Sequence, residues 1–283
     1  MSQLPESHAP AAPAVSSPVP PSVLPSAQPF SIVLNDLNFA DPFRWLAAGW
    51  RDFRRAPGIG LFYGTCFAVM GWLLLKVFEY SPAWTLALSA GFLLMGPFLC
   101  LGLYDVSRKL ERGERPDFGD SLTAWDTKLG TMAIFGTVLL VLEMVWARAS
   151  LVVFALSFDG MPDFKGSLLK LVDPENIEFI VAYTAVGSLF AGMIFAVSVV
   201  SMPMILDRQT DAIMAGLTSL RLCLTQPGVL LQWGATITLL VVLAMLPGFL
   251  GLLVVGPVLG HASWHAYRSA VAPEESRPEN APG

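Results

Sequence analysis

Residues 41–58 read DPFRWLAAGWRDFRRAPG and predict a helix that lies at a membrane surface. The stretch opens with an aspartate that can cap a helix and a proline that suits the first helical position. Leu46, Trp50 and Phe53 then recur with helical spacing and form one apolar face. Arginines occupy much of the remaining surface, which favours contact with anionic lipid headgroups, and a long apolar run follows directly. We therefore expect an interfacial helix that precedes a membrane span.

The composition is that of a membrane protein. Of the 283 residues, 54% are hydrophobic and 14% are charged, whereas soluble domains carry about 25% charged residues. The mean hydropathy is +0.59. The net charge of -5 comes from acids and bases that are mixed along the loops, so we expect no nucleic-acid partner. Three cysteines at unrelated spacings predict neither a disulfide framework nor a CxxC metal site.

The chain divides into a membrane domain and two tails. Residues 1–35 are rich in Pro, Ala and Ser and predict a disordered cytoplasmic tail, and residues 271–283 predict a second one. Residues 36–270 then form the membrane domain, with six apolar stretches that are each near the ~20 residues a spanning helix needs. Leu246-Pro247-Gly248 alone separates the last two, which predicts a tight helical hairpin. The stretches are residues 59–78, 83–104, 130–157, 178–204, 227–246 and 248–267.

The basic residues predict the orientation. Most of the 17 Lys and Arg residues fall before the first span, between the second and third, between the fourth and fifth, or after the sixth. Cytoplasmic loops carry such an excess of basic residues. We therefore expect a multi-pass protein of the bacterial inner membrane with both termini in the cytoplasm, and we expect the loop Asp159–Glu178 on the opposite side.

The opening helix has two weaker copies, which predict an internal repeat. Each predicted copy precedes an odd-numbered span, and each even-numbered span contains a proline, at Pro97, Pro203 and Pro257. The sequence therefore predicts an all-α polytopic fold, with six transmembrane helices and three amphipathic interfacial helices in a threefold internal repeat. The apolar faces that superimpose are Leu46, Trp50 and Phe53, then Phe118, Leu122 and Trp125, then Ile213, Leu217 and Leu220.

Two histidines and two aspartates are expected at the same depth, near the cytoplasmic ends of the even-numbered spans. His261 and His265 lie four residues apart, so they share a helix face on which both imidazoles can reach one ion. Two interpretations stay open. The histidines are ordinary residues of the membrane interface, in which case we expect no cofactor, or they bind haem or a divalent metal, with Asp105 and Asp207 as the completing ligands.

Ionisable residues inside spans are candidate functional residues. Glu143 lies about 20 Å along the third span at 1.5 Å per residue, so it must face protein or water, or be protonated. Arg148 is five residues further on, which does not favour a simple pair on one helix face. Lys76 and Glu79 can pair across one helical turn near the outer interface.

Three segments carry a resemblance to a known family. They are residues 202–211 (MPMILDRQTD), residues 260–268 (GHASWHAYR) and residues 146–149 (WARA). Over residues 33–270 the chain resembles a bacterial, mostly proteobacterial, domain-of-unknown-function family of predicted six-helix integral membrane proteins. The resemblance implies the fold but no activity. Arg208, inside the first of these segments, joins Asp207 as a candidate functional residue.

No sequence motif for phosphate binding, nucleophilic catalysis or a catalytic metal is present in a suitable context. We therefore expect no enzymatic activity. The leading prediction is a structural, scaffolding or accessory membrane component that contacts the lipid bilayer and binds a membrane-protein partner or a second copy of itself. The alternative predictions are a small-solute or ion transporter that uses Glu143 and a cytoplasm-facing concavity, and a metal- or haem-binding protein that uses His261 and His265.

Overall fold

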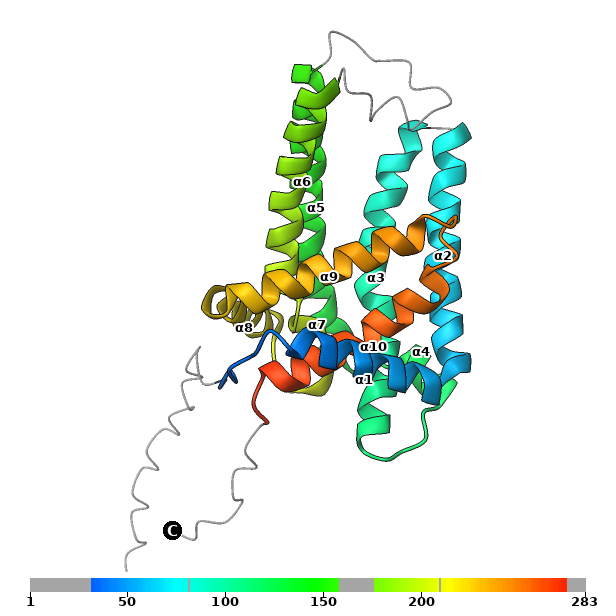
Figure 1. Cartoon of the computed structure of the whole chain (residues 1–283), viewed down its shortest axis with the longest axis vertical. Coiled ribbons are helices and arrows are strands. Elements are labelled where there is room, and N and C mark those ends of the chain that lie inside the picture. The colour runs from blue at the N-terminus through cyan, green and yellow to red at the C-terminus, as the bar shows by residue number, and fades with distance from the viewer. Residues whose placement is uncertain (1–31, 81, 158–175, 209, 274–283) are drawn as a thin grey trace, which may run out of the picture. The chain divides into compact units, whose positions relative to one another are not determined.

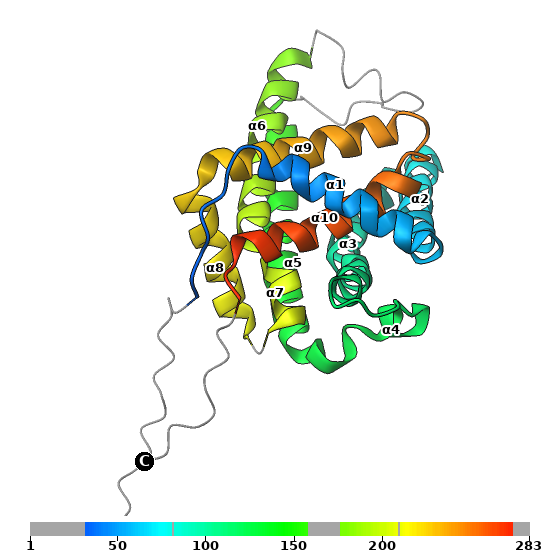
Figure 2. The same cartoon turned by 60° about the horizontal axis from the view of Figure 1, so that its bottom comes forward.

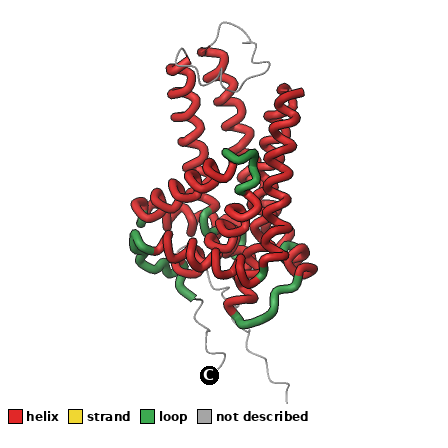
Figure 3. The backbone as a smooth tube through the Cα atoms, turned by 45° about the vertical axis from the view of Figure 1, so that its right-hand side comes forward, coloured by secondary structure: helices red, strands yellow, loops and turns green. Residues whose placement is uncertain are grey.

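The computed structural model describes residues 32–80, 82–157, 176–208 and 210–273. The outer parts of both predicted tails, and almost all of the predicted loop Asp159–Glu178, lie outside the described residues. Throughout the described part the regular elements are helices, without strands, which confirms the all-α prediction (Figure 3). The elements are α1 (Asp41–Arg55), α2 (Pro57–Tyr80), α3 (Pro82–Glu111), α4 (Phe118–Thr123), η1 (Asp126–Lys128), α5 (Leu129–Ser157), α6 (Ile177–Ser198), α7 (Ser201–Asp207), α8 (Ala212–Thr225), α9 (Pro227–Met245) and α10 (Leu252–Ala270).

Each of the six predicted apolar stretches is helical. Within the described residues, four helical segments are long and apolar enough to cross a membrane, namely α2, α5, the range Ile177–Asp207 that comprises α6 and α7, and α9. Helix α10 is not among them because its second half carries polar residues. The described part of the chain is thus helical with four candidate membrane spans, and the count of six transmembrane helices stays a prediction.

The helices form two upright pairs with a crossing hairpin. Helices α2 and α3 run side by side, as do α5 and α6, and α9 crosses both pairs (Figure 1). Helices α1 and α10 lie against each other near the lower end of these pairs (Figure 2). The two ends of the described domain also meet, because the amide of Asn35 donates to the carbonyl of Ala270 and the amide of Ala272 donates to the carbonyl of Val33.

The predicted hairpin between α9 and α10 is present. Its turn contains Gly248 and Phe249 at φ +63° and +66°. The Phe249 ring packs onto Gly71 of α2, where an added Cβ would lie 2.3 Å from a ring carbon. Residues 72–80 of α2 continue beyond this contact for roughly 13 Å at 1.5 Å per residue. The hairpin therefore ends beside the body of α2 and does not reach its far end.

Helix α1 buries only part of the predicted apolar face, because Phe53 is buried, Leu46 is half-buried and Trp50 is exposed. Its buried side chains include Trp45 and Asp52, whereas Trp50 is 45% exposed. The physical reason is the tight packing of α1 on α10. A Cβ at Gly49 would lie 2.5 Å from the carbonyl oxygen of Val258, so only a glycine fits against this backbone.

The copies of this helix share an outward apolar position. Trp50, Leu122 and Leu217 coincide in the predicted repeat, and they are 45%, 42% and 42% exposed. The second copy, α4, is only six residues long. The order of elements agrees with the predicted unit, in which a short helix precedes two long ones, while the threefold repeat itself stays a prediction.

The second proline of the pattern, Pro203, lies just after a break in its helix. Helix α6 ends at Ser198 and the buried helix α7 begins at Ser201. Pro203 has no backbone N–H, and its ring crowds the carbonyl of Val199, four residues earlier. The hydroxyl of Ser201 donates to the carbonyl of Ala215 at 3.0 Å and so joins α7 to α8. By contrast, Pro97 and Pro257 lie inside continuous helices.

Candidate functional site

Four polar side chains meet where α1, α3 and α10 pack together. We call them the His261 cluster: Asp52 of α1, Ser107 of α3, and His261 and His265 of α10. The Oγ atom of Ser107 lies 2.8 Å from Nδ1 of His261, and Nε2 of His265 lies 2.7 Å from Oδ2 of Asp52. Asp52, Ser107 and His261 are buried, while His265 is half-buried. These contacts link three helices that are far apart in the sequence.

The sequence folds this way locally because α10 has small residues where its neighbours approach. Gly260 lies against the Leu103 side chain of α3, and Ala262 lies against Gly49 of α1. The i, i+4 spacing then directs both histidines to one side of α10, as predicted. The indole of Trp45 donates to the hydroxyl of Ser269 at 2.7 Å. This second contact between α1 and α10 lies about two turns before Asp52 on α1 and about one turn after His265 on α10.

The electrostatics of Asp52 follow from these partners. Burial alone would raise the pKa of its carboxyl, since the charged form loses water. The hydrogen bonds from His265 and Ser107, together with the nearby imidazoles, outweigh this effect and hold the pKa below its usual value. Asp52 is therefore an ionised acceptor at neutral pH, shared between α3 and α10.

The predicted metal ligands do not come together. His261 faces Ser107, His265 faces Asp52, and the buried Nε2 atom of His261 has no hydrogen-bond partner in the described structure. Asp105 and Asp207, the predicted completing ligands, lie in other interactions, described next. Over the residues that are described, no group of three or more His, Cys, Asp and Glu side chains is arranged to hold a metal ion. A metal or haem would therefore depend on the two histidines alone.

Asp105 lies near the end of α3 and forms ion pairs there. It is buried, and its partners are Arg108 and Lys109, the latter at 3.4 Å. Lys109 also pairs with Asp120 of α4, and Arg108 donates to the carbonyl of Leu206 in α7 at 3.3 Å. The carboxylate is thus the centre of a network that holds α3, α4 and α7 in place.

Asp207 and Arg208, at the end of α7, form hydrogen bonds with the end of α10. The hydroxyl of Tyr267 donates to Oδ2 of Asp207 at 2.8 Å and accepts from Nε of Arg208 at 2.9 Å. Arg208 also donates to the carbonyl of Ala272, just beyond α10. The two residues therefore connect the end of α7 to the end of α10. Glu111 of α3 also contacts α10, because it accepts hydrogen bonds from Trp264 and Arg268.

Glu143 and Arg148 lie on different faces of α5. Glu143 is 5% exposed and shares the inward face with Phe135 and Leu139, so it faces protein, one of the predicted environments. Its Oε2 atom has no hydrogen-bond partner among the described residues. Arg148 is exposed. At the outer end of α2, the predicted pair of Lys76 and Glu79 is confirmed at 2.8 Å.

Several residues of these networks were not predicted. Asp52, Ser107, Glu111 and Ser269 were not singled out in the sequence. The one local signal at Asp52 is the glycine three residues earlier, which permits a close helix contact. A carboxylate inside such a contact needs a partner.

Comparison with known proteins supports a membrane family without an assigned activity. Residues 85–207 match a family model described as "Predicted integral membrane protein (DUF2189)". The match includes Asp105, Glu143, Arg148 and Asp207, and it stops before the two histidines. A search of curated proteins found no match. A search of solved structures found none either.

Proposed function

We infer that the chain is an integral membrane protein with several apolar helices. We propose that it is a structural, scaffolding or accessory component of the bacterial inner membrane and that it is not an enzyme. One observation carries this proposal. The polar residues that sequence reasoning marks as candidate sites at the lower end of the domain are engaged in contacts between helices. Asp105, Asp207 and His265 each have partners on the same or neighbouring helices.

Catalytic residues must be able to reach a substrate. Asp105, Ser107 and His261 are each at most 3% exposed, which suits a structural role better than a chemical one. The hydrogen bond between Ser107 and His261 joins α3 to α10. The ion-pair partners of Asp105, which are Lys109 and Arg108, connect α3 to α4 and α7. We infer that these polar groups hold the lower ends of the helices in fixed positions.

The arrangement supports an orientation with both termini in the cytoplasm. Asn35 and Ala270 are hydrogen-bonded, so the two ends of the domain emerge on the same side. The basic residues of α1 and of the α3–α4 region lie at this end, as expected for the cytoplasmic side. The contact between Phe249 and Gly71 further favours a hairpin of α9 and α10 that turns inside the membrane. We therefore propose that α9 and α10 enter and leave on the cytoplasmic side.

The outward faces of the short helices support contact with lipid. Trp50, Leu122 and Leu217 point away from the protein, and Arg51 and Arg54 are exposed beside the first of them. An apolar strip flanked by arginines is typical of a helix at an interface with anionic headgroups. We propose that α1, α4 and α8 rest on the cytoplasmic surface of the bilayer.

Isolation from native membranes tests the scaffolding role. A chain with a C-terminal tag, expressed from its own promoter and extracted in mild detergent, is expected to carry a stable membrane-protein partner or to form a homo-oligomer. The control is an unrelated tagged membrane protein at the same expression level. Repeated recovery of a lone monomer would contradict the proposal.

A second candidate function, transport, is favoured by Glu143 alone. Its carboxylate is buried on an inward helix face, and its Oε2 atom has no hydrogen-bond partner in the part of the chain that the structure describes. Ionisable groups at such positions carry protons or ions in many membrane proteins. If the chain transports a solute through this group, Glu143→Gln should abolish flux into proteoliposomes while the protein stays folded. Flux that is equal in the wild type and the variant would rule out the role given to Glu143.

A further inference from the structure

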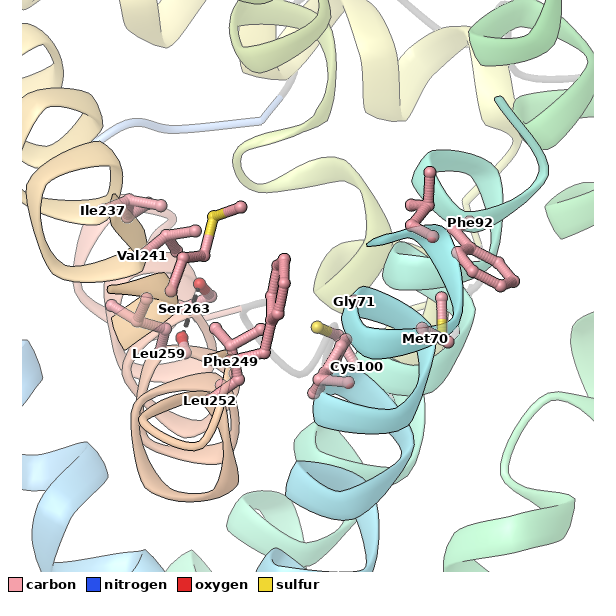
Figure 4. A pocket seen from close by; sticks show the side chains of 15 residues that line it. Met70, Gly71, Phe92, Cys100, Ile237, Val241, Phe249, Leu252, Leu259 and Ser263 are labelled. Carbon is pink, nitrogen blue, oxygen red and sulfur yellow. Dashed lines mark hydrogen bonds between the residues drawn. The ribbon is translucent and has the colours of Figure 1, made fainter. Parts of the chain in front are cut away.

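A cavity of about 460 Å³ lies between the α9–α10 hairpin and the pair α2 and α3. Figure 4 shows Ile237 and Val241 of α9 and Ser263 of α10 on one side, and Met70 of α2 and Cys100 of α3 on the other. The volume is within the range of sites that hold a small ligand, roughly 300–1,000 Å³. No residue assigned to the proposed structural role lines this cavity.

The lining is apolar. Among the described residues that form it, none is charged. Its hydroxyl, on Ser263, already donates to the carbonyl of Leu259 at 2.8 Å within α10, as the dashed line in Figure 4 marks. A water molecule needs two to four polar partners to be stable in a cavity. The site therefore suits a ligand without hydrogen-bonding groups in the part that enters.

The cavity lies at the depth of the hydrocarbon layer. Its α2 residues extend from Phe67 to Leu74, roughly 15 to 25 Å from the Pro57 end of the helix at 1.5 Å per residue. The hydrocarbon core of a bilayer is about 30 Å thick. Molecules that reach this depth from the bilayer are the acyl chains of its lipids.

The cavity is open to its surroundings. Met245, at the end of α9, lines it and is 41% exposed, and Val241 and Leu74 are half-buried. A chain can thus enter from the side without unfolding a helix. The hairpin turn forms part of the wall, because Phe249 stands between α10 and Gly71 of α2.

We propose that this cavity binds one acyl chain of a bilayer phospholipid. Filling it restores the contacts that the half-buried side chains of α2, α3, α9 and α10 would otherwise lack. The bound chain would join the hairpin to α2 and α3 and act as part of the packed structure. The headgroup would stay at the membrane surface, outside the cavity.

Native mass spectrometry of the full chain tests this site. The protein is purified in mild detergent after reconstitution in vesicles of phosphatidylethanolamine and phosphatidylglycerol, and the retained lipids are counted and weighed. The wild type is expected to retain one phospholipid per chain. Val241→Trp, which fills the cavity from α9, is expected to lose it. The neighbouring Val242→Trp adds the same bulk on the exposed face of α9 and is expected to retain the lipid.

A second pair of variants, on α2, repeats the test in case the first pair does not fold. Leu74→Trp fills the cavity from α2, and Leu73→Trp changes an exposed position of the same helix. Only variants that elute as folded protein in size-exclusion chromatography are compared. Equal retention in the filled and control variants would overturn the proposal, as would a wild type without lipid. A retained mass that matches a free fatty acid or an isoprenoid would overturn the assignment to phospholipid.

Discussion

The Nε2 atom of His265 lies 2.7 Å from Oδ2 of Asp52, across the contact between α10 and α1. In the sequence, the two residues belong to the first and the last helix of the membrane domain. Asp52 is buried, and the side chain of His265 is 23% exposed. The pair therefore fixes the first helix of the domain on the last one, next to the hydrogen bond between Ser107 and His261.

The stability of the protein is expected to depend on pH through Asp52. Its pKa is lower in the folded protein than in the unfolded chain. The stabilisation is thus complete above the unfolded value of about 3.9 and is lost as the pH falls through the lowered folded value. Thermal unfolding in detergent between pH 7 and pH 3 should show that Asp52→Asn is less stable than the wild type at pH 7. The difference should shrink in acid. A difference that grows in acid would contradict the assignment.

Gly49 is expected to tolerate no side chain. A Cβ there would lie 2.5 Å from the carbonyl oxygen of Val258 and 2.7 Å from the amide nitrogen of Ala262, and backbone atoms cannot move aside easily. Gly49→Ala should therefore destabilise the protein by about 1–3 kcal/mol in spite of the better helix propensity of alanine. Gly58→Ala, at the start of α2, is the control, because no atom lies within 4 Å of its added Cβ. Equal unfolding temperatures of the two variants would contradict the close packing of α1 on α10.

The two histidines are expected to bind no metal or haem. Each already has a side-chain partner, and the predicted aspartates lie elsewhere. Metal analysis of the purified protein should find no stoichiometric ion, and its absorption spectrum should lack a Soret band. About one equivalent of metal per chain that disappears in His261→Ala would prove this prediction wrong.

The turn between α9 and α10 is expected to be inaccessible to reagents that are added outside the cell. A cysteine at Leu250, an exposed residue of the turn, should not react with a charged maleimide added to intact cells, in a variant without the three native cysteines. A cysteine at Tyr80, which is 83% exposed at the far end of α2, should react. Equal labelling at both positions would favour six full spans and contradict the embedded hairpin.

The helices could be predicted because their signals are local. The proline and glycine after residue 56 separate α1 from α2, and the turn at Leu246-Pro247-Gly248 separates α9 from α10. The spacing of His261 and His265 likewise fixes them on one side of α10. Such features depend on neighbours within a few residues, so the sequence alone carries them.

The partners of the polar residues could not be predicted, since they depend on contacts between distant helices. Asp52 resembles a surface residue among arginines, and its partner His265 lies 213 residues further along the chain. The sequence places Asp105 and Asp207 at the same expected membrane depth as the two histidines. It does not indicate the direction in which each side chain points. The apolar spacing on α1 also did not decide which side chains face the protein interior. In a membrane protein Trp50 can face lipid as favourably as it faces a core.

We propose that the buried polar residues hold helices together and do not form a reaction centre. A double-mutant cycle on Asp52 and His265 tests it most directly, by denaturant unfolding of wild type, Asp52→Ala, His265→Ala and the double variant in mild detergent. We expect a coupling free energy of about 1–3 kcal/mol between the two residues. Free energies of unfolding that add to within about 0.5 kcal/mol would contradict it.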